Sequence, residues 1–552
     1  MPAYALALTL AVLAPLLQPG YLLLRDAVST PRSYLSDAAL GLSEAAPRAL
    51  PQDFAVAVGS WVFGGDVVVK ALLMLGLWLA GWGAARLVGT VVPAAGVAGQ
   101  FVAVTVAIWN PYVAERLLQG HWSLLVGYGA LPWVATTVLR LRDGTGGWWP
   151  LPFWIALAGL TPTGLLLAAV VALLGVAAPG AARPRWLCAV VSLGVAVLAA
   201  VPWLLASALA GSLSSTQSAG VPAFAARAES GLGMLGSLAG LAGIWNAQAV
   251  PDSRTTLFAV AGTAVLLVVV ALGLPTALRR PAAVPLLLLA AAAVVLPAAL
   301  ATGPGVALLE ALVREVPGLG VLRDGQKWVA LAMPGYALAA GCAVVTLRPR
   351  VPALATAAVC CLALLAVLPD LAWGVGGKVM AVRYPPGWAT VAALINADPR
   401  PVAVLPPDIM REFGWAGTAP VLDPLPRWVS ADVLATGDLV IGGRTVPGEG
   451  QRARDVQRLL ESGASADVLA RNGVGWVVVE AGGTTPPPAL NLPVVHHDGD
   501  LTLYRVGGDR PAADGGAAMI VAHLVWLATL IVGGVGSVAG ALARRRRDRA
   551  SG

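Results

Sequence analysis

The first residue able to do chemistry is an aspartate at the start of the first long polar segment. Asp26 follows an apolar run that ends at Leu24, so we expect it at the outer end of a first membrane helix. A carboxylate there could act as a general base toward a hydroxyl group, or bind a divalent cation beside a phosphate leaving group. The alternative is an interfacial charge, solvated by lipid headgroups and paired with Arg25 or Arg32.

A second group of functional residue types lies in the short segment NPYVAERLLQGHW (110–122). We expect Glu115 and Arg116 to begin a short interfacial helix, and His121 to stand where the next membrane helix starts. A lone histidine is usually structural, and Trp122 is typical of a membrane interface. Glutamate, arginine and histidine together at the end of a membrane helix are instead typical of a functional site.

The third group is the segment LRDGQKW (322–328), in which Asp324 lies between two cations. Arg323 and Lys327 are four residues apart, so in a helix they would share a face. Two cations on the outer surface of a membrane suit a lipid-linked phosphate or pyrophosphate. General attraction to anionic headgroups is the alternative.

Other residues give no sign of a metal site or a nucleotide site. His496 and His497 are adjacent in an expected hairpin, where they would point to opposite faces, so a surface turn is favoured over a shared metal. The four cysteines all stand in apolar runs and are expected to be packing residues. There is no Walker-type phosphate loop and no glycine-rich dinucleotide fingerprint, which argues against ATP or NAD chemistry.

The elements that must position these residues are membrane helices. The chain of 552 residues is 58% hydrophobic and only 12% charged, about half the charged fraction of a typical soluble protein. Apolar runs long enough to cross a bilayer, or nearly so, recur along it. They predict about twelve transmembrane helices, near 3–24, 67–86, 88–108, 122–139, 148–160, 163–178, 186–208, 256–276, 282–301, 328–346, 352–369 and 517–542.

Arginine clusters predict the orientation of these helices. With alternating helices, every cluster falls on one side, which the positive-inside rule makes cytoplasmic. These clusters are Arg140 and Arg142, Arg183 and Arg185, Arg279 and Arg280, Arg348 and Arg350, and the run Arg544 to Arg547 in the tail 543–552. Both termini are then cytoplasmic. The long segments 25–66, 109–121, 209–255, 302–327 and 370–516 lie outside.

The segment 370–516 is expected to be a small extracytoplasmic α/β domain between a transmembrane part, 1–369, and the final helix, 517–542. Its charge rises and its patterns become those of a soluble unit. We expect helices over 388–397, 453–461 and 465–471. We expect strands over 402–405 and 475–480, and a hairpin over 494–506 that turns at Asp498-Gly499.

Together, these features resemble the C-type (GT-C) superfamily of membrane glycosyltransferases. Asp26 matches the acidic residue that such enzymes carry in their first outer loop. The segments 110–122 and 322–328, and the pattern LARNGVGWVVVE…LTLYRV (469–506), look like parts of actinobacterial multi-pass proteins related to AftD and to YfhO-like proteins. The first loop departs from the pattern, because it has no paired Asp-Asp or Asp-x-Asp motif.

The resemblance implies an enzyme of the bacterial inner membrane that builds cell-envelope glycan or glycolipid from a polyprenyl-phosphate-linked sugar. It implies that Asp26 is the base, and that Arg25, Glu115, Arg116, His121, Arg323, Asp324 and Lys327 bind donor or acceptor. A divalent cation is a candidate cofactor. Two alternatives stay open: a transporter or flippase of a lipid-linked intermediate, and a non-catalytic envelope assembly factor. Charge at mid-membrane depth and internal repeats, which transporters usually show, are nearly absent, His523 being the exception.

Overall fold

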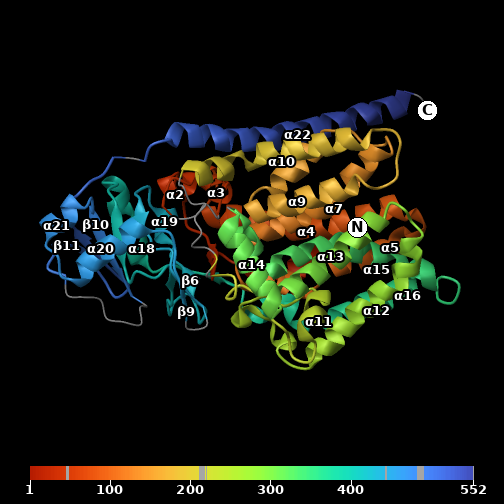
Figure 1. Ribbon diagram of the computed structural model, residues 1–552, viewed down its shortest axis with the longest axis horizontal. Coiled ribbons are helices and arrows are strands. Elements are labelled where there is room, and N and C mark those ends of the chain that lie inside the picture. The colour runs from red at the N-terminus through yellow and green to blue at the C-terminus, as the bar shows by residue number, and fades with distance from the viewer. Residues whose placement is uncertain are drawn as a thin grey trace.

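The computed structural model describes residues 1–44, 49–209, 218, 220–316, 318–441, 444–481, 490–511 and 513–550. A bundle of apolar helices forms one end of the elongated molecule and an α/β domain forms the other (Figure 1). The longest helix, α22 (Gly516–Ala550), lies along α10 (Arg185–Leu209) on the outside of the bundle.

The N-terminal apolar run is not one helix, as the sequence predicts, but a helix followed by a strand. α1 (Pro2–Leu13) continues as the 3₁₀ turn η1 (Ala14–Leu17) and ends before the Pro19-Gly20 pair. The chain then forms β1 (Tyr21–Leu24), which pairs with β2 (Ala27–Val28) and with the distant β3 (Ala381–Val382). Asp26 therefore stands in a two-residue hairpin turn, not at the end of a helix.

The other helices of the bundle include those of the apolar runs, together with helices in segments that were predicted to be loops, such as α14. The longer ones are α4 (Gly65–Val91), α5 (Gly96–Ile108), α7 (Trp122–Arg142), α9 (Pro162–Gly175), α12 (Phe258–Leu278), α13 (Val284–Leu300), α14 (Gly303–Glu315), α15 (Met333–Leu347) and α16 (Ala353–Ala366). The shorter ones are α2 (Asp37–Leu40), α3 (Gln52–Gly59), α6 (Pro111–Leu118), α8 (Pro150–Ala158), α11 (Gly233–Ala239) and α17 (Ala372–Gly377). The 3₁₀ turns are η2 (Pro93–Ala95), η4 (Ala247–Ala249), η5 (Asp252–Arg254), η6 (Leu319–Leu322), η7 (Gly325–Ala332) and η8 (Pro369–Leu371).

Seven helical segments within the described residues are long and apolar enough to cross a membrane, and two bent pairs raise the count to nine. The pairs are α13 with α14, bent by 93°, and α16 with η8 and α17, bent by 75°. Each of the twelve predicted runs contains a helix, but several are too short to span a bilayer alone, so the count of twelve is not confirmed. The prediction of a multi-pass membrane protein is confirmed at this coarser level.

Burial separates central from peripheral spans. In an apolar stretch of 18 residues within each span, 83%, 89% and 89% of the residues are buried for 93–118, 122–142 and 325–347, against 33%, 39% and 28% for α10, α12 and α22. Apolar side chains that the protein leaves uncovered are suited to lipid. The three central spans carry or adjoin the polar segments 110–122 and 322–328. The bundle thus holds the predicted chemistry away from lipid.

The α/β domain is built on a five-stranded sheet of order β11-β12-β10-β4-β7, in which β10, β4 and β7 run parallel. Two short hairpin-like pairs, β5 with β6 and β8 with β9, extend from it. The strands are β4 (Val402–Leu405), β5 (Met410–Arg411), β6 (Val421–Leu422), β7 (Val433–Leu434), β8 (Leu439–Ile441), β9 (Arg444–Val446), β10 (Trp476–Glu480), β11 (Val494–His497) and β12 (Leu501–Arg505). The helices are α18 (Pro386–Ala397), α19 (Leu425–Trp428), α20 (Gln451–Glu461) and α21 (Ala466–Arg471).

The elements predicted between 388 and 506 are all found, with bounds that differ by two residues at most. The first loop also contributes to this domain, because Leu23 of β1 packs in the same apolar cluster as Trp388 of α18. The Arg25 backbone donates to the carbonyl of Pro420 and accepts from the amide of Leu422, at 2.9 and 2.8 Å. The hairpin that carries Asp26 is therefore held by the bundle on one side and the α/β domain on the other.

A buried ion network stabilises the centre of the α/β domain. The Arg411 Nε donates to Glu480 at 2.6 Å, and its NH2 lies 3.7 Å from Asp423. Burial and the charge of Asp423 raise the pKa of Glu480 to about 8. Glu480 therefore holds a proton at neutral pH, which avoids two carboxylate charges around one arginine.

Candidate functional site

The segment 110–122 forms a buried helix that begins earlier than predicted. Asn110 caps α6 by accepting from the amide of Val113 at 3.1 Å, and Pro111 occupies the first helical position, where no amide is needed. Glu115 and Arg116 therefore fall in the middle of the helix. Both side chains are fully buried. The prediction of an interfacial helix that begins at these residues is therefore wrong, because the helix begins at Pro111 and lies inside the protein.

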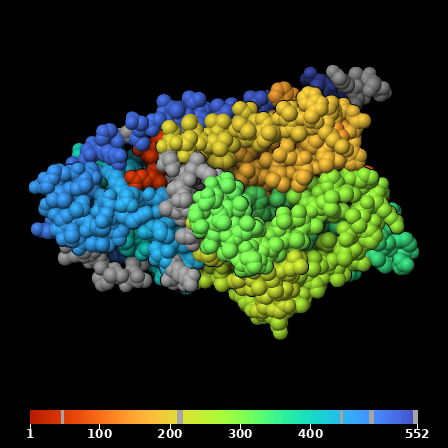
Figure 2. All heavy atoms as spheres, viewed as in Figure 1, coloured from red at the N-terminus to blue at the C-terminus, as the bar shows by residue number. Residues whose placement is uncertain are grey.

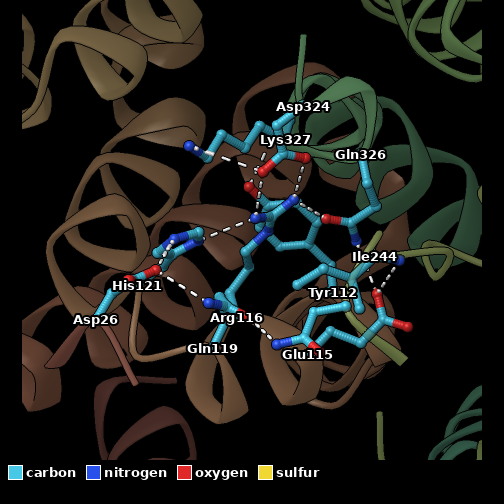
Figure 3. A network of polar contacts seen from close by, with 11 residues as sticks. Asp26, Tyr112, Glu115, Arg116, Gln119, His121, Ile244, Asp324, Gln326 and Lys327 are labelled. Carbon is cyan, nitrogen blue, oxygen red and sulfur yellow. Dashed lines mark hydrogen bonds and ion pairs between the residues drawn. The ribbon is translucent and has the colours of Figure 1, made fainter. Parts of the chain in front are cut away.

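Arg116 connects the segment 110–122 to the segment 322–328 (Figure 3). Its guanidinium donates to both carboxylate oxygens of Asp324, at 3.0 and 3.1 Å, and also to the side chain of Gln326. Its NH1 donates to the Nδ1 of His121 at 2.9 Å. A planar guanidinium suits such bidentate contacts. The charge of Arg116 is thus satisfied inside the protein.

The contact with Arg116 fixes the tautomer of His121. A guanidinium only donates, so the Nδ1 of His121 must accept, and the proton of the neutral ring must be on Nε2. That Nε2 lies 2.9 Å from the Oδ2 of Asp26, to which it donates. Burial lowers the pKa of His121, and the nearby charges of Lys327 and Arg116 keep it below the ordinary value. His121 is therefore a neutral donor aimed at Asp26.

Asp26 is an ionised carboxylate with one oriented oxygen. Its Oδ2 also accepts from the Nε2 of Gln119 at 3.0 Å, whereas no described residue donates to Oδ1. Burial alone would raise the pKa of Asp26, but its hydrogen bonds from His121 and Gln119 and the charge of Lys327 outweigh burial and lower it. Its side chain is 41% exposed. The group is suited to accept a proton from a substrate.

Gly120 allows the hairpin turn to approach the helix end. Its φ is +81°, a conformation that glycine adopts freely. A Cβ at this position would lie 2.3 Å from the amide nitrogen of Ala27 and from the carbonyl oxygen of Leu24. The Asp26 amide also donates to the carbonyl of Gln119 at 3.2 Å. This backbone contact brings Asp26 beside His121.

Lys327 is a cation of the site that is partly exposed. Its side chain is 26% exposed, and its Nζ lies 3.7 Å from the Oδ2 of Asp324. The segment folds as the 3₁₀ turns η6 and η7, so residues three apart share a face and Lys327 faces Asp324. Arg323 instead stacks on Phe224 at 4.6 Å. The α-helical face predicted for Arg323 and Lys327 is therefore not formed, although the two cations remain near enough for their charges to interact.

Asp324 is a partner for cations and not a second free carboxylate. Burial would raise its pKa, but the charges of Arg116 and Lys327 hold it well below its usual range. Two other predicted residues also have internal partners. Glu115 accepts from the amides of Gly243 and Ile244, at 3.2 and 3.1 Å. The Arg25 guanidinium donates to the carbonyls of Leu118 and Gln248, at 2.6 and 2.8 Å. It is not bound to Asp26.

Three amide side chains of the site are absent from the sequence prediction. Gln119 orients Asp26 and accepts from Asn246 at 2.8 Å, while Gln326 connects Arg116 to Glu115 with a 3.0 Å bond to the latter. Glutamine and asparagine have no spacing signature of their own. Gln119 and Gln326 could have been noticed by their position within the segments 110–122 and 322–328, whereas Asn246 lies in neither segment.

The donor set does not fit a resident metal ion. Among the described residues, no three His, Cys, Asp or Glu side chains gather as ligands. At Asp26 itself, both nitrogens of His121 are used by hydrogen bonds, and both oxygens of Asp324 are bound to Arg116. Within the described part of the cluster, the Oδ1 of Asp26 is the oxygen left as a ligand, and one monodentate oxygen is a poor site for a divalent cation.

The fold is similar to part of a mycobacterial protein of known structure. No protein-family model matches the chain, and no curated protein matches it in sequence. Two solved structures of the arabinofuranosyltransferase AftD from mycobacteria, the second of them a mutant, are similar to it with TM-scores of 0.53 and 0.50. Each is 18% identical and covers 93% and 92% of this chain. The chain covers only 40% and 41% of those proteins, so the comparison confirms the predicted resemblance at the level of fold.

Proposed function

We propose that this chain is a membrane glycosyltransferase of cell-envelope assembly, which transfers a sugar from a polyprenyl-phosphate donor to a glycan or glycolipid acceptor. The observation that carries the proposal is the ionised Asp26, whose Oδ2 is held by His121 and Gln119 while Oδ1 stays available. The fold shared with an arabinofuranosyltransferase supports the same class of reaction.

In the proposed reaction, Asp26 is the general base. The acceptor hydroxyl gives its proton to Asp26 as its oxygen forms a bond to the anomeric carbon of the donor. The bond from that carbon to the phosphate oxygen breaks, and its electron pair leaves with the lipid phosphate. Among the described side chains of the cluster, no second carboxylate is free to form a covalent intermediate, so a single displacement with inversion is expected.

Lys327 is proposed to stabilise the leaving phosphate. It is close enough to lower the pKa of Asp26, and its ammonium group is partly exposed. A cation held near a developing phosphate charge lowers the barrier for departure. Arg116, Glu115 and Arg25 are proposed to act indirectly, because each is buried and bound to other protein groups. Their role is to position His121, Gln326 and the Asp26 hairpin.

The site is proposed to face the outside of a bacterial inner membrane, with both termini in the cytoplasm. The arginine clusters support this orientation. Arg142 donates to the carbonyls of Gly180 and Arg183, which brings two predicted cytoplasmic loops together. Thr276 and Thr346, near the ends of α12 and α15, are hydrogen bonded at 2.7 Å. The arginine clusters 279–280 and 348–350, which follow these helices, are therefore also close together. The C-terminal arginines lie at the end of the molecule opposite the α/β domain (Figure 1).

The cellular test is complementation of a deletion strain that has a measured defect in envelope glycan composition. Wild type and Lys378→Ala, a lysine paired with Asp252 and not part of the cluster around Asp26, should restore the composition. Asp26→Ala and Lys327→Ala should not, at equal protein level in the membrane. Full restoration by both site variants would refute the assigned roles and favour a flippase or a non-catalytic assembly factor.

A further inference from the structure

A cavity of about 790 Å³ separates the first loop from the α/β domain. On one side it is lined by α2 and α3, and on the other by the residues that precede and follow β4 and β7. Its volume falls within the range of small-molecule sites. Figure 2 shows the first loop (red) between the α/β domain (blue) and α10 (yellow).

The cavity adjoins the proposed active site without containing it. Asp26 is not among its lining residues, but Val28, two residues further on, and Trp122, next to His121, both are. A chain-like ligand that fills the cavity could therefore extend past these two side chains toward Asp26. Lys327, the proposed phosphate partner, is not among the lining residues either.

The two walls are tied together by polar contacts. Arg427 of α19 binds Asp53 of α3, with nitrogen–oxygen distances of 3.1 and 3.2 Å. The amide of Arg452 donates to Glu44 at 3.0 Å, again joining the α/β domain to the first loop. These contacts link the two walls of the cavity to each other.

The charge of the lining selects a class of ligand. Among the residues that the structure describes, eight carboxylates and four guanidinium groups line the cavity, so the field of this lining is negative and unfavourable for phosphates. A neutral sugar is suited to such a wall, because each hydroxyl can donate to a carboxylate and accept from a guanidinium. Tyr34, half-buried in the first-loop wall, adds an aromatic ring against which the apolar face of a sugar can pack.

We infer that this cavity binds an uncharged oligosaccharide segment of the acceptor, which it holds with one end directed toward Asp26. The inference rests on the proposed function, since a glycosyltransferase must hold its acceptor beside its base. The charge pattern then separates the two substrates: the anionic lipid phosphate belongs at Lys327, and the neutral glycan belongs in the carboxylate-rich cavity.

The test is direct binding to the full-length protein in lipid nanodiscs, measured by isothermal titration calorimetry. The probes are an arabinofuranose hexasaccharide and mannohexaose, with inorganic phosphate as the anionic comparison. Ala38→Trp and Ala435→Trp place an indole in the cavity from opposite walls. Ala393→Trp, on the exposed side of α18 and outside the lining, is the matched control.

We expect at least one neutral hexasaccharide to bind wild type and Ala393→Trp equally, and each cavity variant at least tenfold more weakly. Asp26→Asn should bind the sugar like wild type while failing to transfer to it. Equal binding by all variants, or binding of phosphate but of neither sugar, would overturn the inference. Binding that depends on the cavity but is never accompanied by transfer would instead contradict the proposed function.

Discussion

Replacing His121 with alanine tests whether this residue orients the proposed base. The imidazole donates to the Oδ2 of Asp26 at 2.9 Å, and Gln119 donates to the same oxygen at 3.0 Å. His121→Ala removes the first of these bonds and leaves the second. Arg116 loses one acceptor but keeps both oxygens of Asp324, so the rest of the cluster should persist.

The expected loss follows from the kind of bond removed. A hydrogen bond to a charged group contributes about 1.5–3 kcal/mol. If that energy serves to hold Asp26 in its reactive orientation, the transfer rate falls by about 10- to 150-fold. The lost donor also raises the pKa of Asp26. Because the base works only when ionised, the acid limb of the rate profile should move to higher pH.

The assay is the rate of sugar transfer against pH, with wild type, His121→Ala, His121→Gln and a surface control. A glutamine amide can donate toward Asp26, so His121→Gln should recover part of the rate. His497→Ala is the control, because that ring is exposed and bound to Thr502. A rate for His121→Ala within twofold of wild type would refute the orienting role. A loss equal to that of Asp26→Asn, with no shift of the acid limb, would show that His121 itself acts on the substrate.

Three further predictions concern the phosphate partner, the close backbone contact and the buried ion network. Lys327→Ala should lower kcat and kcat/KM for the lipid donor by about tenfold or more, because the lost contact is strongest to the leaving phosphate, while Lys378→Ala leaves both constants unchanged in the same kinetic assay. Gly120→Ala should reduce transfer by more than tenfold, because its Cβ would collide with the hairpin at 2.3 Å, and an active, normally folded Gly120→Ala protein would contradict this account. The pKa of Glu480 is raised from 4.5 to about 8 by folding, so its contribution to stability is complete below 4.5 and is lost as the pH rises through about 8. Thermal unfolding at about pH 6 and about pH 9 should therefore show a fall in Tm for wild type and a smaller fall for Glu480→Gln; equal falls would contradict the protonated state.

Local patterns were sufficient to predict several helices and strands between 388 and 506 and the segments that carry the candidate site, but not the strands and the helix between 410 and 446. The strand 402–405 and the hairpin 494–506 have short, periodic or turn-bounded sequences, and they fold as expected. The three segments with functional residue types were also recognisable. Asp26, Arg116, His121, Asp324 and Lys327 come from all three of them and form one connected cluster in the structure.

Long-range contacts decided what the sequence could not predict. The apolar residues 21–24 look like the end of a membrane helix, but they pair with β3, which lies about 360 residues further along the chain. That pairing turns Asp26 into a hairpin residue. The burial of Arg25 and Arg116 likewise depends on carbonyls and carboxylates from distant segments. A single sequence contains no periodicity that reports such partners.

The most direct test of the central claim is transfer of label from a lipid-linked sugar. Membranes containing wild type or Asp26→Asn at equal protein level would receive radiolabelled decaprenyl- or undecaprenyl-phosphate sugars, and label in envelope glycan would be counted. We predict transfer by wild type and a rate at least about 100-fold lower for Asp26→Asn, the usual contribution of a general base. Equal transfer by both proteins, or none by wild type with any of several donors, would contradict the account.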